Sequence, residues 1–337
     1  MTLLVAACTS PVQSAYSDQV AERLAREIRK LRKSFNAAAG GYAVDLAQSL
    51  SLVSAQNAWA DKGHLLNLVA SIKSDDWESA MQLDDRGRIF YFRVFLEADG
   101  AALGYLCRYV LDRGSLPAND DSWNSVARDM FTEAYKQYAQ LVTRIDERVE
   151  LRRQLKRLDE TGYSGKSGAH KMFVHAQTLY RIGLLAREDT GNGRIYKVPA
   201  QNGVDRIKAF VEEVGDAVSL ERVIAGKRFM EVAAAALDIH EASHTEDEWS
   251  DMNVIDLILP FYERVMSTGV PLCSLGTLVE AVQIDWLQGR GVVIPYDRIL
   301  EALTSAQRRD PRSIRFHVDR RGRPAYLKLD LTRKAAG

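Results

Sequence analysis

The chain has 337 residues, 45 basic and 45 acidic side chains, and 46% apolar residues. This length exceeds what one hydrophobic core usually supports, so we expect two or three domains. The composition excludes a disordered or fibrous chain, and no stretch approaches the roughly 20 apolar residues that a membrane-spanning helix needs. The three cysteines lie far apart, which excludes a disulfide framework and favours a soluble protein of the reducing cytoplasm.

The neutral total conceals strongly segregated charge. The net charge is −2 over residues 1–130, +5 over 131–200, −10 over 201–305 and +7 over 306–337. The two basic blocks coincide with two segments that show the same local pattern, described below. Such a coincidence favours a polyanionic partner, although solvated helix and hairpin faces also carry charge runs.

In the first part of the chain, helical spacing of apolar residues predicts a helix over about 17–35 with a basic opposite face. Residues 42–95 contain a weaker helix-turn-helix-like pattern, a possible third unit. Within it, the aromatic stretch 89–95 suits a buried strand or a helix equally. A further helix is predicted to end at Arg113–Gly114, where Ser115–Pro117 begins a linker. We therefore expect a helical domain over residues 1–122.

A long run of helical spacing extends from Trp123 to Leu158. Its length suits a connecting or dimerising helix, so a homodimer is possible but not required. With the segment that follows it, this helix is expected to form a second domain over residues 123–200. An acidic helical connector over 201–270 and a last domain over 271–337 complete the expected organisation.

Residues 169–198 carry the most informative local pattern of the chain. Apolar residues at helical spacing precede Gly183, which ends the predicted helix as a C-capping glycine would. Two leucines then begin a strand, and Thr190–Gly193 reads as a hairpin turn before an alternating returning strand. The residues predicted to share the apolar helical face are Phe173, Ala176, Leu179 and Tyr180.

The C-terminal segment shows the same order of elements. Two predicted helices, Leu275–Leu287 and Tyr296–Leu303, precede a strand in which Ile314, Phe316 and Val318 alternate with polar residues. The turn at 319–324 holds three arginines, and a second alternating strand returns from it. Both segments thus predict a helix followed by a hairpin with basic residues.

Helix, Gly-rich turn and charged hairpin together resemble the recognition helix and wing of the winged-helix superfamily. The resemblance implies that the hairpin tips lie against DNA phosphates and that the helix before the first hairpin faces the groove. The implied DNA-binding residues are Lys171, His175, Gln177, Arg181, Arg187, Arg194 and Lys197 in the first unit, and Arg315, Arg320, Arg321 and Arg323 in the second. Winged helices also dock proteins, so a protein partner remains an alternative.

One motif points to different chemistry. His240-Glu241-x-x-His244 matches the zincin pattern, in which two imidazoles one helical turn apart bind Zn²⁺, and Glu248 is a candidate third ligand. Its acidic surroundings are unlike the apolar cleft of zinc proteases, so we interpret the match as an exposed helix end. No metal, cofactor or catalytic residue is expected.

The sequence therefore predicts a mainly helical α+β protein with at least two winged-helix-like units joined by helical segments. The predicted function is non-enzymatic binding of double-stranded DNA, as a regulator or as the DNA-engaging subunit of a larger bacterial complex. The alternatives are a scaffold subunit that uses its winged helices to dock proteins, and a zinc-dependent hydrolase.

Overall fold

A computed structural model of the protein describes residues 26, 44, 47–48, 50–54, 60–70, 84–161, 166–191, 193–237, 254–267 and 272–330. The predicted helix at 17–35, apart from residue 26, and the zincin motif lie outside the described residues, as does part of the possible third unit at 42–95. The described chain is mainly helical with two small antiparallel sheets, as expected for the α+β class. It forms two compact units: residues 91–240, called the central unit, and residues 1–90 with 241–337, called the discontinuous unit.

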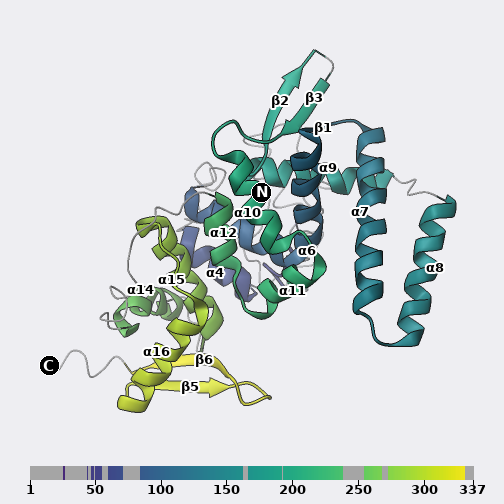
Figure 1. Cartoon of the computed structure of the whole chain (residues 1–337). Coiled ribbons are helices and arrows are strands. Elements are labelled where there is room, and N and C mark those ends of the chain that lie inside the picture. Colours follow the sequence, from purple (N-terminus) through teal and green to yellow (C-terminus); the bar gives the residue numbers. More distant parts are fainter. Residues whose placement is uncertain are drawn as a thin grey trace. The chain divides into compact units, whose positions relative to one another are not determined.

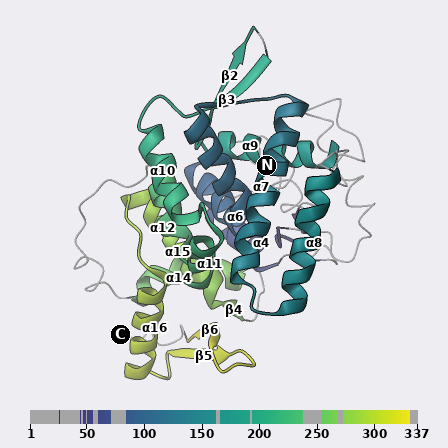
Figure 2. The same cartoon turned by 45° about the vertical axis from the view of Figure 1, so that its right-hand side comes forward.

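The central unit begins within a long helix and ends with three short ones (Figures 1 and 2). Its elements are α6 (Asp85–Arg113, which starts in the discontinuous unit), β1 (Ser115–Pro117), α7 (Asp120–Leu141), α8 (Ile145–Thr161), α9 (Lys166–Arg181), β2 (Ala186–Thr190), β3 (Gly193–Lys197), α10 (Gly203–Val214), α11 (Ala217–Ala225) and α12 (Phe229–Leu237).

The aromatic stretch at 89–95 is part of helix α6, which answers the ambiguity that the sequence left. Its residues are almost all fully buried, and Phe92 packs edge-on against Phe210 of α10 at a ring-centroid distance of 5.5 Å. Gly104 allows α6 to approach the end of α10, because a Cβ there would lie 2.4 Å from the Val214 carbonyl oxygen. This stretch of α6 is buried on all sides and forms part of the core.

The expected linker at Ser115–Pro117 is instead a strand. β1 pairs antiparallel with β3 so that the sheet order is β1-β3-β2, and buried Leu116 lies opposite buried Tyr196. Trp123 and the Tyr196 ring have centroids 5.8 Å apart. Because this pairing joins residues on both sides of the expected boundary at 122, the division into units differs from the domains that the sequence predicted.

The single long helix predicted from Trp123 to Leu158 is likewise two helices. α7 ends at Leu141 and α8 begins at Ile145, and the two pack side by side as a helical hairpin (Figures 1 and 2). The break is stabilised locally, since Arg148 Nε donates to the Val142 carbonyl and Arg144 pairs with Asp146. The apolar spacing of the run therefore continues across two helices, and in α8 its members Ile145 and Val149 are exposed.

The discontinuous unit combines residues from both ends of the chain. Its elements are α4 (Asp61–Ala70), the start of α6, α14 (Val254–Ser267), β4 (Cys273–Ser274), α15 (Leu275–Arg290), α16 (Tyr296–Arg309), β5 (Ile314–Val318) and β6 (Pro324–Leu329). Arg264 of α14 donates to the carbonyls of Asn67 and Leu68, and Arg86 pairs with Asp285 of α15 at 2.6 Å. These contacts join segments about 200 residues apart in the sequence.

The sheet of the discontinuous unit has the order β4-β6-β5. In both units, therefore, a short first strand pairs with the last strand of a hairpin, and helices separate the first strand from the hairpin. The predicted helices before the second hairpin and its two strands are confirmed, with α15 and α16 extending beyond their predicted ends.

The buried first strand gives a test of this architecture. Leu116→Ala is expected to lower the free energy of unfolding by about 2–5 kcal/mol, because it leaves a cavity against Tyr196. Ser115→Ala, one residue earlier in the same strand, is the matched control. Urea unfolding followed by circular dichroism measures both; equal stabilities of the two variants would contradict the assignment of β1 to the core.

Candidate nucleic-acid interface

The β5–β6 hairpin has one apolar and one basic face. Ile314, Leu327 and Leu329 are buried on the side that packs against the helices. The strand register places Arg315 opposite Lys328 and His317 opposite Tyr326, and all four of these side chains are exposed. They share the outer face of the sheet because residues directly opposite on paired strands point to the same side.

The turn of this hairpin is held by a carboxylate bonded to the backbone. Asp319 accepts hydrogen bonds from the backbone N–H groups of Arg321 and Arg323 at 2.8 and 2.9 Å. These bonds hold the pKa of Asp319 below its ordinary value, with a smaller contribution from the nearby Arg323 charge. Gly322 takes the left-handed conformation that the turn requires, with φ of 76°. The turn thus forms without using its arginine side chains.

A similar arrangement follows helix α16. Arg308 and Arg309 form the exposed last residues of the helix, and Arg312 is exposed in the loop before β5. Asp310 accepts from the backbone N–H groups of Arg312 and Ser313 at 3.1 and 3.2 Å. We call residues 308–329, from this helix end through the hairpin, the basic segment.

The basic segment carries seven arginines, none of which forms an ion pair or side-chain hydrogen bond with another residue that the structure describes. In chain order they are Arg308, Arg309, Arg312, Arg315, Arg320, Arg321 and Arg323. In addition, Arg315 and Lys328 face each other across the strands, a like-charge pair that destabilises a hairpin unless an anion compensates it. Arg308, Arg309, Arg312 and Lys328 were missed by reasoning from the turn alone, although they belong to the same arginine-rich run.

The β2–β3 hairpin of the central unit uses its charges differently. Arg194 Nε lies 3.0 Å from Asp189 on the opposite strand, and Lys197 forms an ion pair with Glu188. Arg194 holds the pKa of Asp189 below its ordinary value through their hydrogen bond. The hairpin projects from the helices of its unit in both views, but two of its basic side chains already have carboxylate partners (Figures 1 and 2).

The remaining predicted contacts of this unit lie around helix α9. Arg181 is exposed, and Arg187 lies over the Tyr180 ring with 4.8 Å between its guanidinium carbon and the ring centroid. Gln177 is half-buried and donates to the Tyr196 hydroxyl. Lys171 lies in α9, and its side chain is outside the described part of the structure.

His175 does not face a groove, contrary to the prediction. Only 9% of it is exposed, and its Nε2 lies 3.0 Å from the Asp99 carboxylate at the kink of α6. The reason is the orientation of α9: its buried stripe is Met172, His175, Ala176 and Leu179, whereas the prediction had chosen Phe173 and Tyr180, which are only half-buried. The His175 ring therefore occupies an apolar position of the helix.

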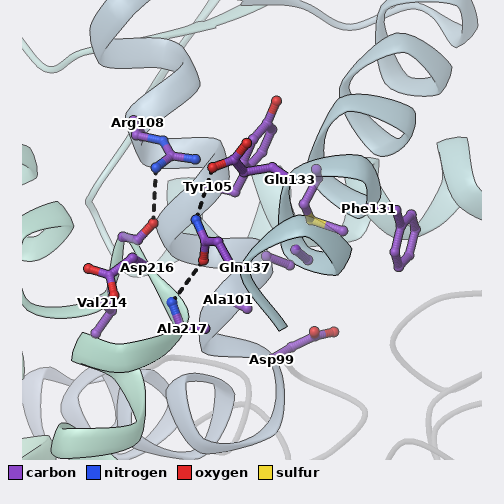
Figure 3. A pocket seen from close by; sticks show the side chains of 14 residues that line it. Asp99, Ala101, Tyr105, Arg108, Phe131, Glu133, Gln137, Val214, Asp216 and Ala217 are labelled. Carbon is purple, nitrogen blue, oxygen red and sulfur yellow. Dashed lines mark hydrogen bonds between the residues drawn. The ribbon is translucent and has the colours of Figure 1, made fainter. Parts of the chain in front are cut away.

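A pocket of about 130 Å³ lies in the central unit between α6, α7 and the turn from α10 to α11 (Figure 3). Gln137 accepts from the Ala217 N–H at 3.0 Å and donates to Glu133, while Arg108 donates to the Gly215 carbonyl. Burial raises the pKa of Tyr105 to about 12, and the charge of Asp129 adds to the shift. The bonds of Gln137 and Arg108 join α7 and α6 to the turn between α10 and α11, so the pocket lies at a junction of helices.

Comparison with models of known protein families, with curated proteins and with solved structures finds no match for this chain. Within the described ranges, no helix is both long and apolar enough to span a bilayer, and no group of three or more His, Cys, Asp or Glu side chains is placed to hold a metal ion.

The carboxylate at the turn gives a prediction for pH dependence. Because the folded-state pKa of Asp319 is lowered, its stabilisation of the turn is present above the ordinary aspartate pKa and is lost as pH falls through the lower folded value. NMR titration of the Asp319 side chain is expected to give a pKa below 3.8, with the amide protons of Arg321 and Arg323 shifting over the same range. An ordinary pKa, with unaffected amides, would contradict the turn geometry.

Proposed function

We propose that the protein is a non-enzymatic DNA-binding protein and that the basic segment of the discontinuous unit is its main DNA contact. The observation that carries the proposal is the set of seven exposed arginines that form no ion pair or side-chain hydrogen bond with another described residue. Guanidinium groups bind phosphate oxygens in pairs of parallel hydrogen bonds, and a polyanion would also relieve the repulsion between Arg315 and Lys328.

We propose further that both units are winged-helix units, with the β5–β6 turn as the DNA-contacting wing. The order of elements supports this: a short strand, helices, then a hairpin whose last strand lies between the other two. In such a unit the wing lies against the phosphate backbone or in the minor groove. Arg320, Arg321 and Arg323 are then the wing-tip contacts.

The exposed side of α16 supports a wing-centred mode of binding. Asp297 and Glu301 are exposed in the N-terminal half of the helix, where negative charge opposes approach to phosphates, whereas Arg308 and Arg309 are at its other end. We therefore assign phosphate contact to the end of α16 and the hairpin. Such contacts position a protein on DNA without reading its sequence, which suits a DNA-engaging subunit of a larger complex.

The alternative of a protein-docking scaffold is favoured for the central unit by one observation. In α8, Ile145 and Val149 are 79% and 50% exposed on successive turns of the helix. With the β2–β3 hairpin partly neutralised by its own carboxylates, this unit is better suited to hold a partner protein than to bind phosphate.

Salt dependence of DNA affinity tests the proposal. Duplex affinity is expected to fall steeply with salt, and Arg320→Ala with Arg321→Ala is expected to weaken binding and to flatten the slope of log K against log salt by about 2, because two phosphate contacts are lost. Fluorescence anisotropy of a labelled duplex at several salt concentrations measures both quantities.

The matched control removes two arginines from the other hairpin. Arg187→Ala with Arg194→Ala is expected to change the slope much less, because these side chains already contact Tyr180 and Asp189. An equal effect of the two double variants on the slope would contradict the assignment of the main DNA contact to the discontinuous unit. Absence of duplex binding by the unaltered protein at physiological salt would refute the proposed function.

A further inference from the structure

We infer that the outer face of the β5–β6 hairpin binds unpaired bases, so that the DNA this protein engages includes a single-stranded stretch. This inference rests on the proposed function and specifies the form of nucleic acid. It is carried by the position of Tyr326 and His317 among the basic side chains of the same face.

Tyr326 lies in the middle of this face. It is 41% exposed on β6, the central strand, and the register places it between Ser274 of β4 and His317 of β5. Side chains directly opposite on paired strands have Cβ atoms about 5 Å apart, so Tyr326 and His317 occupy adjacent positions of this face. On the other flank, the Ser274 side chain accepts from the Thr277 N–H at the start of α15. The face therefore presents aromatic surface to solvent.

These rings have no structural task among the described residues. Neither the Tyr326 nor the His317 side chain forms a hydrogen bond, ion pair or ring contact with another described residue. In the central unit, by comparison, the tyrosine of strand β3, Tyr196, lies on the buried face of its sheet, against Trp123 and bonded to Gln177. An exposed aromatic ring surrounded by cationic side chains offers a surface on which a base can stack.

The neighbouring charges indicate what the rings contact. Arg315 and Lys328 lie one pleat further along the same face, beside His317 and Tyr326 respectively. Bases stacked on aromatic rings with their phosphates held by adjacent cations are the usual arrangement for single strands, and stacking tolerates any base because each has a π face. In a duplex the faces of the bases are covered by their neighbours, so the two rings have nothing to stack on.

The other residues of the basic segment fit a division of the surface into positions that bind phosphates and positions that bind bases. The turn arginines can bind the phosphates of duplex and of single-stranded DNA alike. The helix that would enter a duplex groove, α16, carries Asp297 and Glu301 on its exposed side. Contact with both forms would place the hairpin where a duplex meets a single strand.

The test compares binding of a labelled oligothymidylate with that of a labelled duplex of equal length, using the full chain and fluorescence anisotropy. Tyr326→Leu keeps an apolar side chain and removes the ring. It is expected to weaken oligothymidylate binding about 10-fold and to change duplex binding by less than about 2-fold. Tyr326→Phe, the conservative control, is expected to retain the affinity of the unaltered protein for both.

Two failures are distinguishable. If the unaltered protein binds neither probe, the proposed function itself fails. If it binds the duplex with the expected loss in the Arg320→Ala, Arg321→Ala variant, but Tyr326→Leu leaves oligothymidylate affinity unchanged or lowers both affinities equally, DNA binding stands and base stacking on this face is refuted.

Discussion

The pairing of a short first strand with the last strand of a hairpin is the constraint on which both units depend. In the central unit Leu116 meets Tyr196, and in the discontinuous unit Cys273 meets Leu327. All four residues are buried, so each pairing fixes one face of its sheet against the helices. The period of two along a strand then places the alternate residues on the outer face. The outer positions of Arg315, His317, Tyr326 and Lys328 follow from this pairing.

The two hairpins differ in what their carboxylates contact. In β2–β3, Glu188 and Asp189 bind Lys197 and Arg194 across the strands. In the basic segment, Asp310 and Asp319 accept from backbone N–H groups at the two turns. A carboxylate bonded to the backbone stabilises the chain reversal without forming a hydrogen-bonded ion pair with a guanidinium group. The two basic hairpins therefore have different surfaces. Exposed ion pairs contribute little to stability, so the difference matters for binding more than for folding.

Three differences between the predicted and the observed structure have the same physical origin. The strand at Ser115–Pro117 was predicted as a linker because its partner is about 80 residues later in the chain. The helix from Trp123 was predicted as continuous because helical spacing of apolar residues runs on across the break at 142–144, where the chain turns back so that α8 packs against α7. His175 was placed in a groove because α9 has apolar residues on adjacent faces, and spacing alone does not say which face the unit buries. In each case a long-range contact selects among local patterns that are equally good.

The sequence by itself determined the mainly helical class, the helix that ends before Gly183 and the two hairpins with their turns. It also determined the concentration of arginines near the C-terminus. These features could be predicted because helical spacing, glycine conformation and net charge are local properties. Only the tertiary structure decided which of these arginines are unpaired, which face of α9 is buried and that Tyr326 lies exposed beside His317. Those features depend on strand register and on packing between distant segments, and both are set when the chain closes its sheets and buries its apolar faces.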